Sequence, residues 1–187
     1  TSGHIESILA SFTGGMLTFF LLVLISKRVQ GRFIILIIGL LFGHLTSSLI
    51  NIVVSSSEAI KIKLFVLWNL GSFSRTTFED LTYFVPIIIL GIVWSATLIK
   101  KLNIFLLGED TAHSLGVSLE RHKWFIITPM AILSTTVTAF CGPITFIGIL
   151  APHIVRRFLK EELHEIVLPG SILTGALLAL SAETLVM

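Results

Sequence analysis

Few residues in this chain could carry chemistry, and the densest group of them lies in one apolar stretch. His153, Arg156 and Arg157 fall within CGPITFIGILAPHIVRRF, residues 141–158. An imidazole in such a stretch can serve as a pathway or gating group, or it can donate to a neighbouring carbonyl and pack. Arginines at the end of an apolar helix reach the head-group layer of a membrane. The stretch therefore predicts a membrane helix, and both roles of His153 stay open.

The other candidate ligands and nucleophiles form no recognisable site. His44, His113 and His164 lie on separate segments without the spacing of a metal site. The single cysteine, Cys141, makes no internal disulfide. The sequence has no GxxxxGK[ST] phosphate loop, no HExxH pair and no GxSxG elbow. We therefore expect no catalytic residue, no cofactor and no metal site, and we expect that the chain is not an enzyme.

The composition is that of a membrane protein. Of the 187 residues, 54% are hydrophobic and 13% are charged, whereas about 25% are charged in an ordinary soluble domain. The mean hydropathy is +0.97. No basic patch with interleaved aromatic residues argues for nucleic acid as a partner.

The chain contains several apolar segments. Their lengths are near the roughly 20 residues that a membrane helix needs. In lipid every backbone polar group needs an internal partner, so these segments must be helical. The predicted fold class is an all-α membrane protein, a polytopic helical bundle of about six transmembrane helices plus short outer and inner helices. The predicted spans are residues 8–25, 33–54, 81–99, 124–140, 144–158 and 166–187.

The connection between the fourth and fifth spans is short. Cys141-Gly142-Pro143 predicts a tight turn, with Pro143 near the first position of the next helix, where its missing N–H is tolerated. The two spans are therefore expected to form a helical hairpin.

Two longer connections predict short helices. Residues 64–70 are too few to cross, so they predict either a short outer helix at the mouth of a cavity or an interfacial segment anchored by Trp68. Thr76 or Thr77 would cap the helix that follows. Residues 100–123 predict two short helices on the cytoplasmic surface, whose exposed apolar side chains would bind a partner protein.

The basic residues indicate an orientation. If the loop after the first span is cytoplasmic, three basic residues lie outside, Lys61, Lys63 and Arg75, and the other ten lie inside. These ten are Lys27, Arg28, Arg32, Lys100, Lys101, Arg121, Lys123, Arg156, Arg157 and Lys160.

Small residues at four-residue spacing predict helix contacts, because they let helix backbones approach closely in a membrane. Gly39 and Gly43 have this spacing in the second span, and Ser171, Gly175 and Ala179 have it in the last.

Four segments together resemble one family. LLGEDTAHSLGV (106–117), WNLGSF (68–73), GPITFIGILAPHIVRRF (142–158) and LPGSILTGALLALSAETL (168–185) are similar, in the family's order, to motifs of the FecCD-like permeases. These are the membrane subunits of ABC importers for iron-siderophore, heme and cobalamin. Glu183 and Met187 stand where the family commonly has Asp and an Arg that meets the binding protein. Docking charge would then come from Arg75 or from residues beyond the end.

The resemblance implies a permease subunit of an ATP-driven importer in the cell (inner) membrane. Its partners would be a second permease copy in a homo- or heterodimer, cytoplasmic ABC ATPase subunits and an extracytoplasmic substrate-binding protein. The six spans would correspond to the fourth through ninth of the family's ten. Residues 1–187 are expected to be a single transmembrane permease domain that is truncated at both ends.

The resemblance also implies three groups of site residues. The ATPase-coupling loop would contain Leu107, Gly108, Glu109, Ala112, Leu115 and Gly116; the signature helix Gly142, Pro143, Gly148, Pro152, His153 and Arg156; and the outer mouth Trp68, Gly71, Ser72 and Phe73. The alternatives are a fragment of an ion-coupled secondary transporter and a zinc or manganese ABC permease. Both would call for more ionisable residues at mid-membrane depth than this sequence offers.

Overall fold

A computed structural model describes residues 2–26, 32–73, 76–117, 119–144 and 146–186. These residues form helices joined by short connections, without a strand among them. The predicted all-helical class is confirmed. Lys27, Arg28, Arg75 and Met187, on which parts of the predicted orientation and docking depend, lie outside the described residues. In chain order the helices are α1 (Ser2–Ser26), α2 (Arg32–Ser55), α3 (Ala59–Asn69), α4 (Phe78–Thr97), α5 (Ile99–Phe105), α6 (Glu109–Ser114), α7 (Leu119–Cys141), α8 (Ile147–Leu159) and α9 (His164–Val186).

Within the described parts of the chain, 5 helices are long and apolar enough to cross a membrane. They agree closely with five of the six predicted spans. The helix after residue 76 begins where predicted, because the Thr77 side chain accepts from the Asp80 backbone N–H and Asp80 in turn accepts from the Thr77 backbone, a complete capping box. The 5 candidate spans are Ile8–Ile25, Leu36–Ser55, Phe78–Thr97, His122–Cys141 and His164–Leu185.

The helix predicted over residues 144–158 is found, but it begins later than expected and is too short to be one of the candidate spans. Gly142 has a φ of 80° and ends α7, and α8 begins only at Ile147, after Phe146 with a φ of 69°. The 13 residues of α8 extend about 20 Å, short of a hydrocarbon core of about 30 Å. Pro143 therefore precedes α8 in the connection and does not occupy its first turn.

Helix α7 lies between α1 and α4. Two glycines bring the backbones together there. A Cβ on Gly15 of α1 would overlap the Thr135 side chain of α7, and one on Gly91 of α4 would lie 2.6 Å from the Leu133 side chain. Neither glycine belongs to the small-residue patterns predicted from the sequence, and both mark the core of this three-helix layer.

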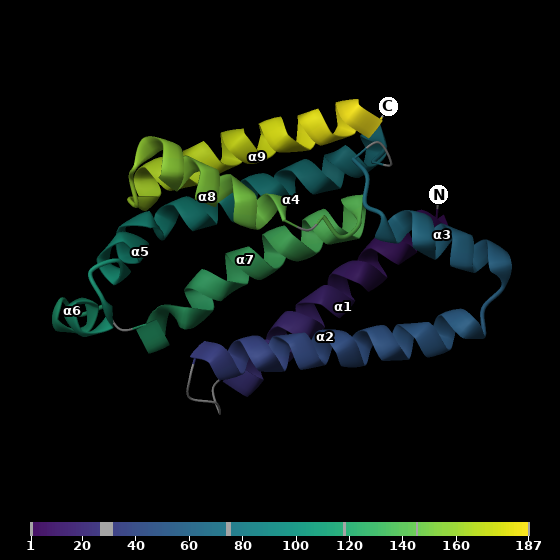
Figure 1. The fold of residues 1–187 in the computed structure, drawn as a ribbon, viewed down its shortest axis with the longest axis horizontal. Helices are drawn as coiled ribbons and strands as arrows, with labels where there is room; N and C mark the ends of the chain where they lie inside the picture. The colour runs from purple at the N-terminus through teal and green to yellow at the C-terminus, as the bar shows by residue number, and fades with distance from the viewer. Residues whose placement is uncertain (1, 27–31, 74–75, 118, 145, 187) are drawn as a thin grey trace.

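The fourth and fifth predicted spans do not pack against each other as the predicted hairpin requires, because α8 packs along α9 instead of α7 (Figure 1). A Cβ on Gly170 of α9 would lie 2.8 Å from the Val155 side chain of α8. A Cβ on Gly175 of α9 would lie 3.7 Å from the Ala151 side chain of α8. The predicted small-residue contact of the last span is thus confirmed at Gly175.

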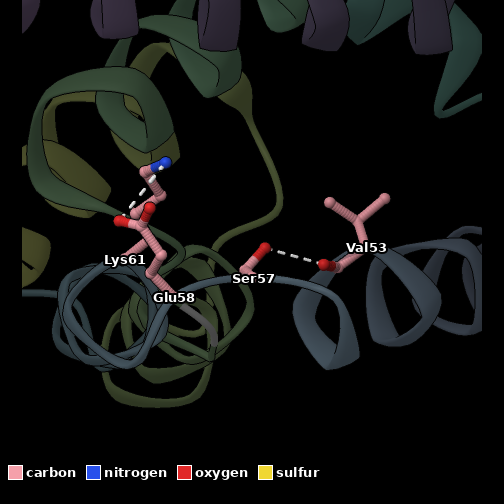
Figure 2. A network of polar contacts seen from close by, with 4 residues as sticks. All are labelled: Val53, Ser57, Glu58 and Lys61. Atoms are coloured by element: carbon pink, nitrogen blue, oxygen red, sulfur yellow. Dashed lines mark hydrogen bonds and ion pairs between the residues drawn. The ribbon is translucent and has the colours of Figure 1, made fainter.

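Helices α2 and α3 pack little against the other helices. None of the candidate span in α2 is buried, and open space surrounds Gly39 and Gly43, so their predicted contact is not made within the described chain. A polar turn joins the two helices (Figure 2): Ser57 Oγ donates to the Val53 carbonyl at 2.7 Å, and Lys61 lies 3.6 Å from Glu58.

The two ends of the bundle differ. Figure 1 places α3 and the C-terminal end of α9 at one end, and α5 and α6 at the opposite end. Short helices are found where they were predicted, α3, which begins earlier than expected, and α5 and α6. The side of the membrane on which each lies stays a prediction.

Candidate functional site

The six-residue helix α6 has a glycine at each end. Gly108 precedes it with a φ of 98°, and Gly116 follows it with a φ of 82°. Gly116 N–H donates to the His113 carbonyl at 3.0 Å, and Val117 N–H donates to the Ala112 carbonyl at 2.9 Å. This pair of bonds is a Schellman motif, which satisfies carbonyls that the helix leaves open. The two glycines of the predicted coupling loop therefore fix the length and direction of α6.

The surface of α6 presents leucines to solvent. Leu107 is 63% exposed and Leu115 is 59% exposed, whereas Ala112 is fully buried. Glu109 is the first residue of α6. We call this element, residues 107–116, the inner knob. Its exposed leucines lie at the end of the bundle, where they are available to another protein.

A polar contact joins α5 to the first residue of α9. Asn103 Oδ1 lies 2.8 Å from His164 N and 2.9 Å from His164 Nδ1. Sequence analysis did not pair these residues, which are 61 positions apart. The sequence held one signal for this contact: Leu163, which precedes α9, has a side chain that cannot cap a helix, so the cap must come from another residue.

A cavity of ≈ 480 Å³ lies between the two packed layers. Its lining comes from α4, α5, α7, α8 and α9 and is mostly apolar, with Arg156 and His164 among its few polar residues. Ser171 also lines it, and its buried Oγ has no hydrogen-bond partner among the described residues. No group of three or more His, Cys, Asp or Glu side chains in the described ranges could hold a metal ion.

The predicted outer mouth and the start of the signature segment lie in direct contact. Ser72 N–H donates to the Cys141 carbonyl at 2.9 Å, and Ser72 Oγ donates to Glu183 Oε1 at 3.4 Å. A Cβ on Gly142 would overlap the Trp68 carbonyl and lie 3.1 Å from Gly71 Cα. We call this set the outer contact. It joins the ends of α3, α7 and α9, which the sequence presented as separate elements.

The other predicted residues lie at the edges of these groups. Phe73 is 37% exposed, beyond the outer contact. Pro143 is half-buried between α7 and α8, and Gly148 is exposed and lines the cavity, with no atom within 4 Å of the position that a Cβ would take. Pro152 and Arg156 line the cavity, but His153 is exposed, on the face of α8 away from Ala151 and Val155.

Comparisons with known proteins point to one family. A family model described as the FecCD transport family matches residues 1–187. The chain is 33% identical over 178 residues to the Fe(3+) dicitrate transport system permease protein FecD of Escherichia coli K12, covering 95% of this chain and 55% of that protein. It is 38% identical over 117 residues to the ferric enterobactin transport system permease protein FepG of the same organism, covering 63% of this chain and 35% of that one.

A solved structure of a metal-chelate type ABC transporter, in an inward-facing conformation, superposes with a TM-score of 0.83 at 26% identity. The match covers 96% of this chain and 62% of that one. The chain thus spans about a third to about half of the length of the two curated relatives.

Proposed function

This chain belongs to the FecCD transport family, and we propose that it acts as a transmembrane permease subunit of an ATP-driven importer for iron-siderophore or related metal chelates. It is a multi-pass membrane protein, and we place it in the cell (inner) membrane with α5 and α6 on the cytoplasmic side. The permease names of its relatives, for ferric dicitrate and ferric enterobactin, support this class of substrate.

The inner knob is the observation that carries the proposal. Two exposed leucines flank a short helix whose ends are fixed by glycines with positive φ and whose centre, Ala112, is buried. Such an element suits insertion into a cleft of a cytoplasmic ATPase, because its shape is set before binding and its apolar side chains lose water on docking.

The proposed division of labour follows from this placement. ATP hydrolysis takes place on the partner ATPase subunits, and the permease converts closure of the ATPase pair into movement of its helices. Such a device works only if the ATPase binds the inward-open and outward-open states with different affinity. The apolar cavity between the two helix layers, ≈ 480 Å³, is space into which α8 and α9 can shift.

Helix α2 supports a second permease copy as a partner. Gly39, Gly43, Ser47 and Asn51 fall on one face at four-residue spacing, and the helix is uncovered within the described chain. Small residues at this spacing allow close helix packing in lipid, and hydroxyl and amide side chains can hydrogen-bond across the contact. We propose that this face lies toward the other permease copy, and that the side with α3 meets the extracytoplasmic binding protein.

Substitution of Leu115 with Asp in the complete permease tests the coupling role. Because Leu115 is 59% exposed, the membrane fold should be unchanged. Docking would bury an unpaired carboxylate at a cost of about 3 kcal/mol, which lowers the affinity for the ATPase about a hundredfold. The measurement is the amount of ATPase that copurifies with the permease, together with chelate uptake.

The matched control is Leu70 to Asp, since Leu70 is 74% exposed and follows α3 at the opposite end of the bundle. This variant should retain the ATPase. Normal ATPase binding and uptake with Asp at position 115 would reject the proposal for the inner knob.

A further inference from the structure

The Asn103–His164 contact supplies the N-terminus of α9 with a partner from another helix. The first-turn N–H groups of a helix have no acceptor within the helix. Leu163, whose carbonyl accepts from Ile166 and Val167, has an aliphatic side chain that cannot cap. Asn103 of α5 takes that role, because its Oδ1 lies 2.8 Å from His164 N. The polar end of α9 is therefore held by α5.

The same oxygen determines that the Nδ1 nitrogen of the imidazole carries a proton. A backbone N–H can only donate, so the atom of Asn103 that faces it is the amide oxygen and not the amide nitrogen. His164 Nδ1 lies 2.9 Å from that same oxygen, so Nδ1 carries a proton and donates. One acceptor thus holds both the backbone and the side chain of His164, which fixes the position of α9 relative to α5 in two directions.

Each side of this contact continues into packed structure. Toward the inner end, α5 leads through the turn at residues 106–108 into the inner knob. Toward the outer end, α8 packs along α9, with Val155 against Gly170 and Ala151 against Gly175. At both contacts a side chain of α8 lies directly against the backbone of α9, so α8 follows a displacement of α9. Between α4 and α5, by contrast, Leu98 interrupts the helix.

We propose that Asn103 and His164 are positioning residues that transmit movement of the inner knob to the α8–α9 pair. The inference rests on the proposed transport function, and it adds the residues through which ATPase closure moves the wall of the cavity. Energetic coupling between distant sites travels through packed side chains and hydrogen bonds that move as a unit. Loss of this link would let α5 and α6 move with the ATPase while α9 stays in place.

The test uses the complete transporter, with its own ATPase and binding protein, reconstituted in liposomes. Uptake of ferric enterobactin or ferric dicitrate is measured beside ATP hydrolysis. Asn103→Leu should lower the chelate imported per ATP hydrolysed about five- to tenfold, in the range of ordinary coupling energies, while hydrolysis continues. Asn103→Asp should remain near wild type, since a carboxylate accepts both hydrogen bonds.

A second pair of variants decides the question if Asn103→Leu does not assemble. His164→Asn keeps an N–H two bonds from Cβ, as Nδ1–H is, and should couple normally. His164→Gln moves that donor one bond further and should lose coupling as Asn103→Leu does. An unchanged ratio of uptake to hydrolysis in both disruptive variants would overturn the inference, and so would a parallel fall of both rates, which indicates lost packing only. A wild type without ATP-dependent uptake would instead reject the transport function itself.

Discussion

Replacing Gly142 with alanine should destabilise the permease, because two features of the structure exclude a side chain at this position. The backbone of Gly142 has a φ of 80°, which costs a residue other than glycine about 1–2 kcal/mol. The added methyl group would also overlap the Trp68 carbonyl and lie 3.1 Å from Gly71 Cα. These are backbone atoms that cannot rotate away, so overpacking adds about 1–3 kcal/mol. Together the two terms predict a loss of about 2–5 kcal/mol.

Gly148 offers a matched control six positions along the same segment. It lies in α8 with nothing within 4 Å of the position that a Cβ would take, so alanine should be neutral or stabilise by up to about 1 kcal/mol. Both variants can be compared by titrating the purified permease in mild detergent with SDS and following tryptophan fluorescence, to which Trp68 at the outer contact contributes. Equal unfolding midpoints for the two variants would refute the close approach of residues 68–71 to Gly142.

Two further predictions concern sidedness and helix packing. In a background with Cys141 replaced by alanine, a cysteine at Lys61 should react with a membrane-impermeant maleimide in intact cells, and one at Leu107 only after permeabilisation; the reverse pattern would invert the orientation. Native Cys141 is a poor reporter because it is 3% exposed. Replacing Gly170 with Leu should destabilise the detergent-purified permease by about 1–3 kcal/mol, because the larger side chain overpacks against Val155. Replacing Gly39 with Leu should not destabilise it, because Gly39 is in open space. Equal effects of the two substitutions would contradict the α8–α9 packing.

Hydropathy predicted the spans well because crossing a membrane demands length and apolar composition, both of which can be counted in a sequence. The same counting misplaced the start of the helix predicted over residues 144–158. These residues are apolar enough, but the positive φ values at Gly142 and Phe146 delay the helix until Ile147, and backbone conformation leaves no trace in hydropathy. The start of α4 was predictable because the signal for a cap, Thr77 with an acidic residue three positions on, is local.

Contacts between distant segments were not predictable in the same way. The packing of α8 on α9 instead of α7 depends on Gly170 meeting Val155, and small residues do not name their partners. Gly39 and Gly43 illustrate this, because they have the favoured spacing and no neighbour in the described chain. Asn103 and His164 carry no motif at all, since an amide and an imidazole far apart in sequence become a pair only when α5 and α9 meet.

The most direct test of the proposed transport function separates its energy source from that of an ion-coupled carrier. The complete transporter, with its ATPase and binding protein, is assayed for uptake of ferric enterobactin and ferric dicitrate, once with ATP hydrolysis blocked and once with the ion gradient dissipated. We predict uptake that stops in the first condition and persists in the second. Uptake that survives the block of hydrolysis and collapses with the gradient would contradict the account and favour a secondary transporter.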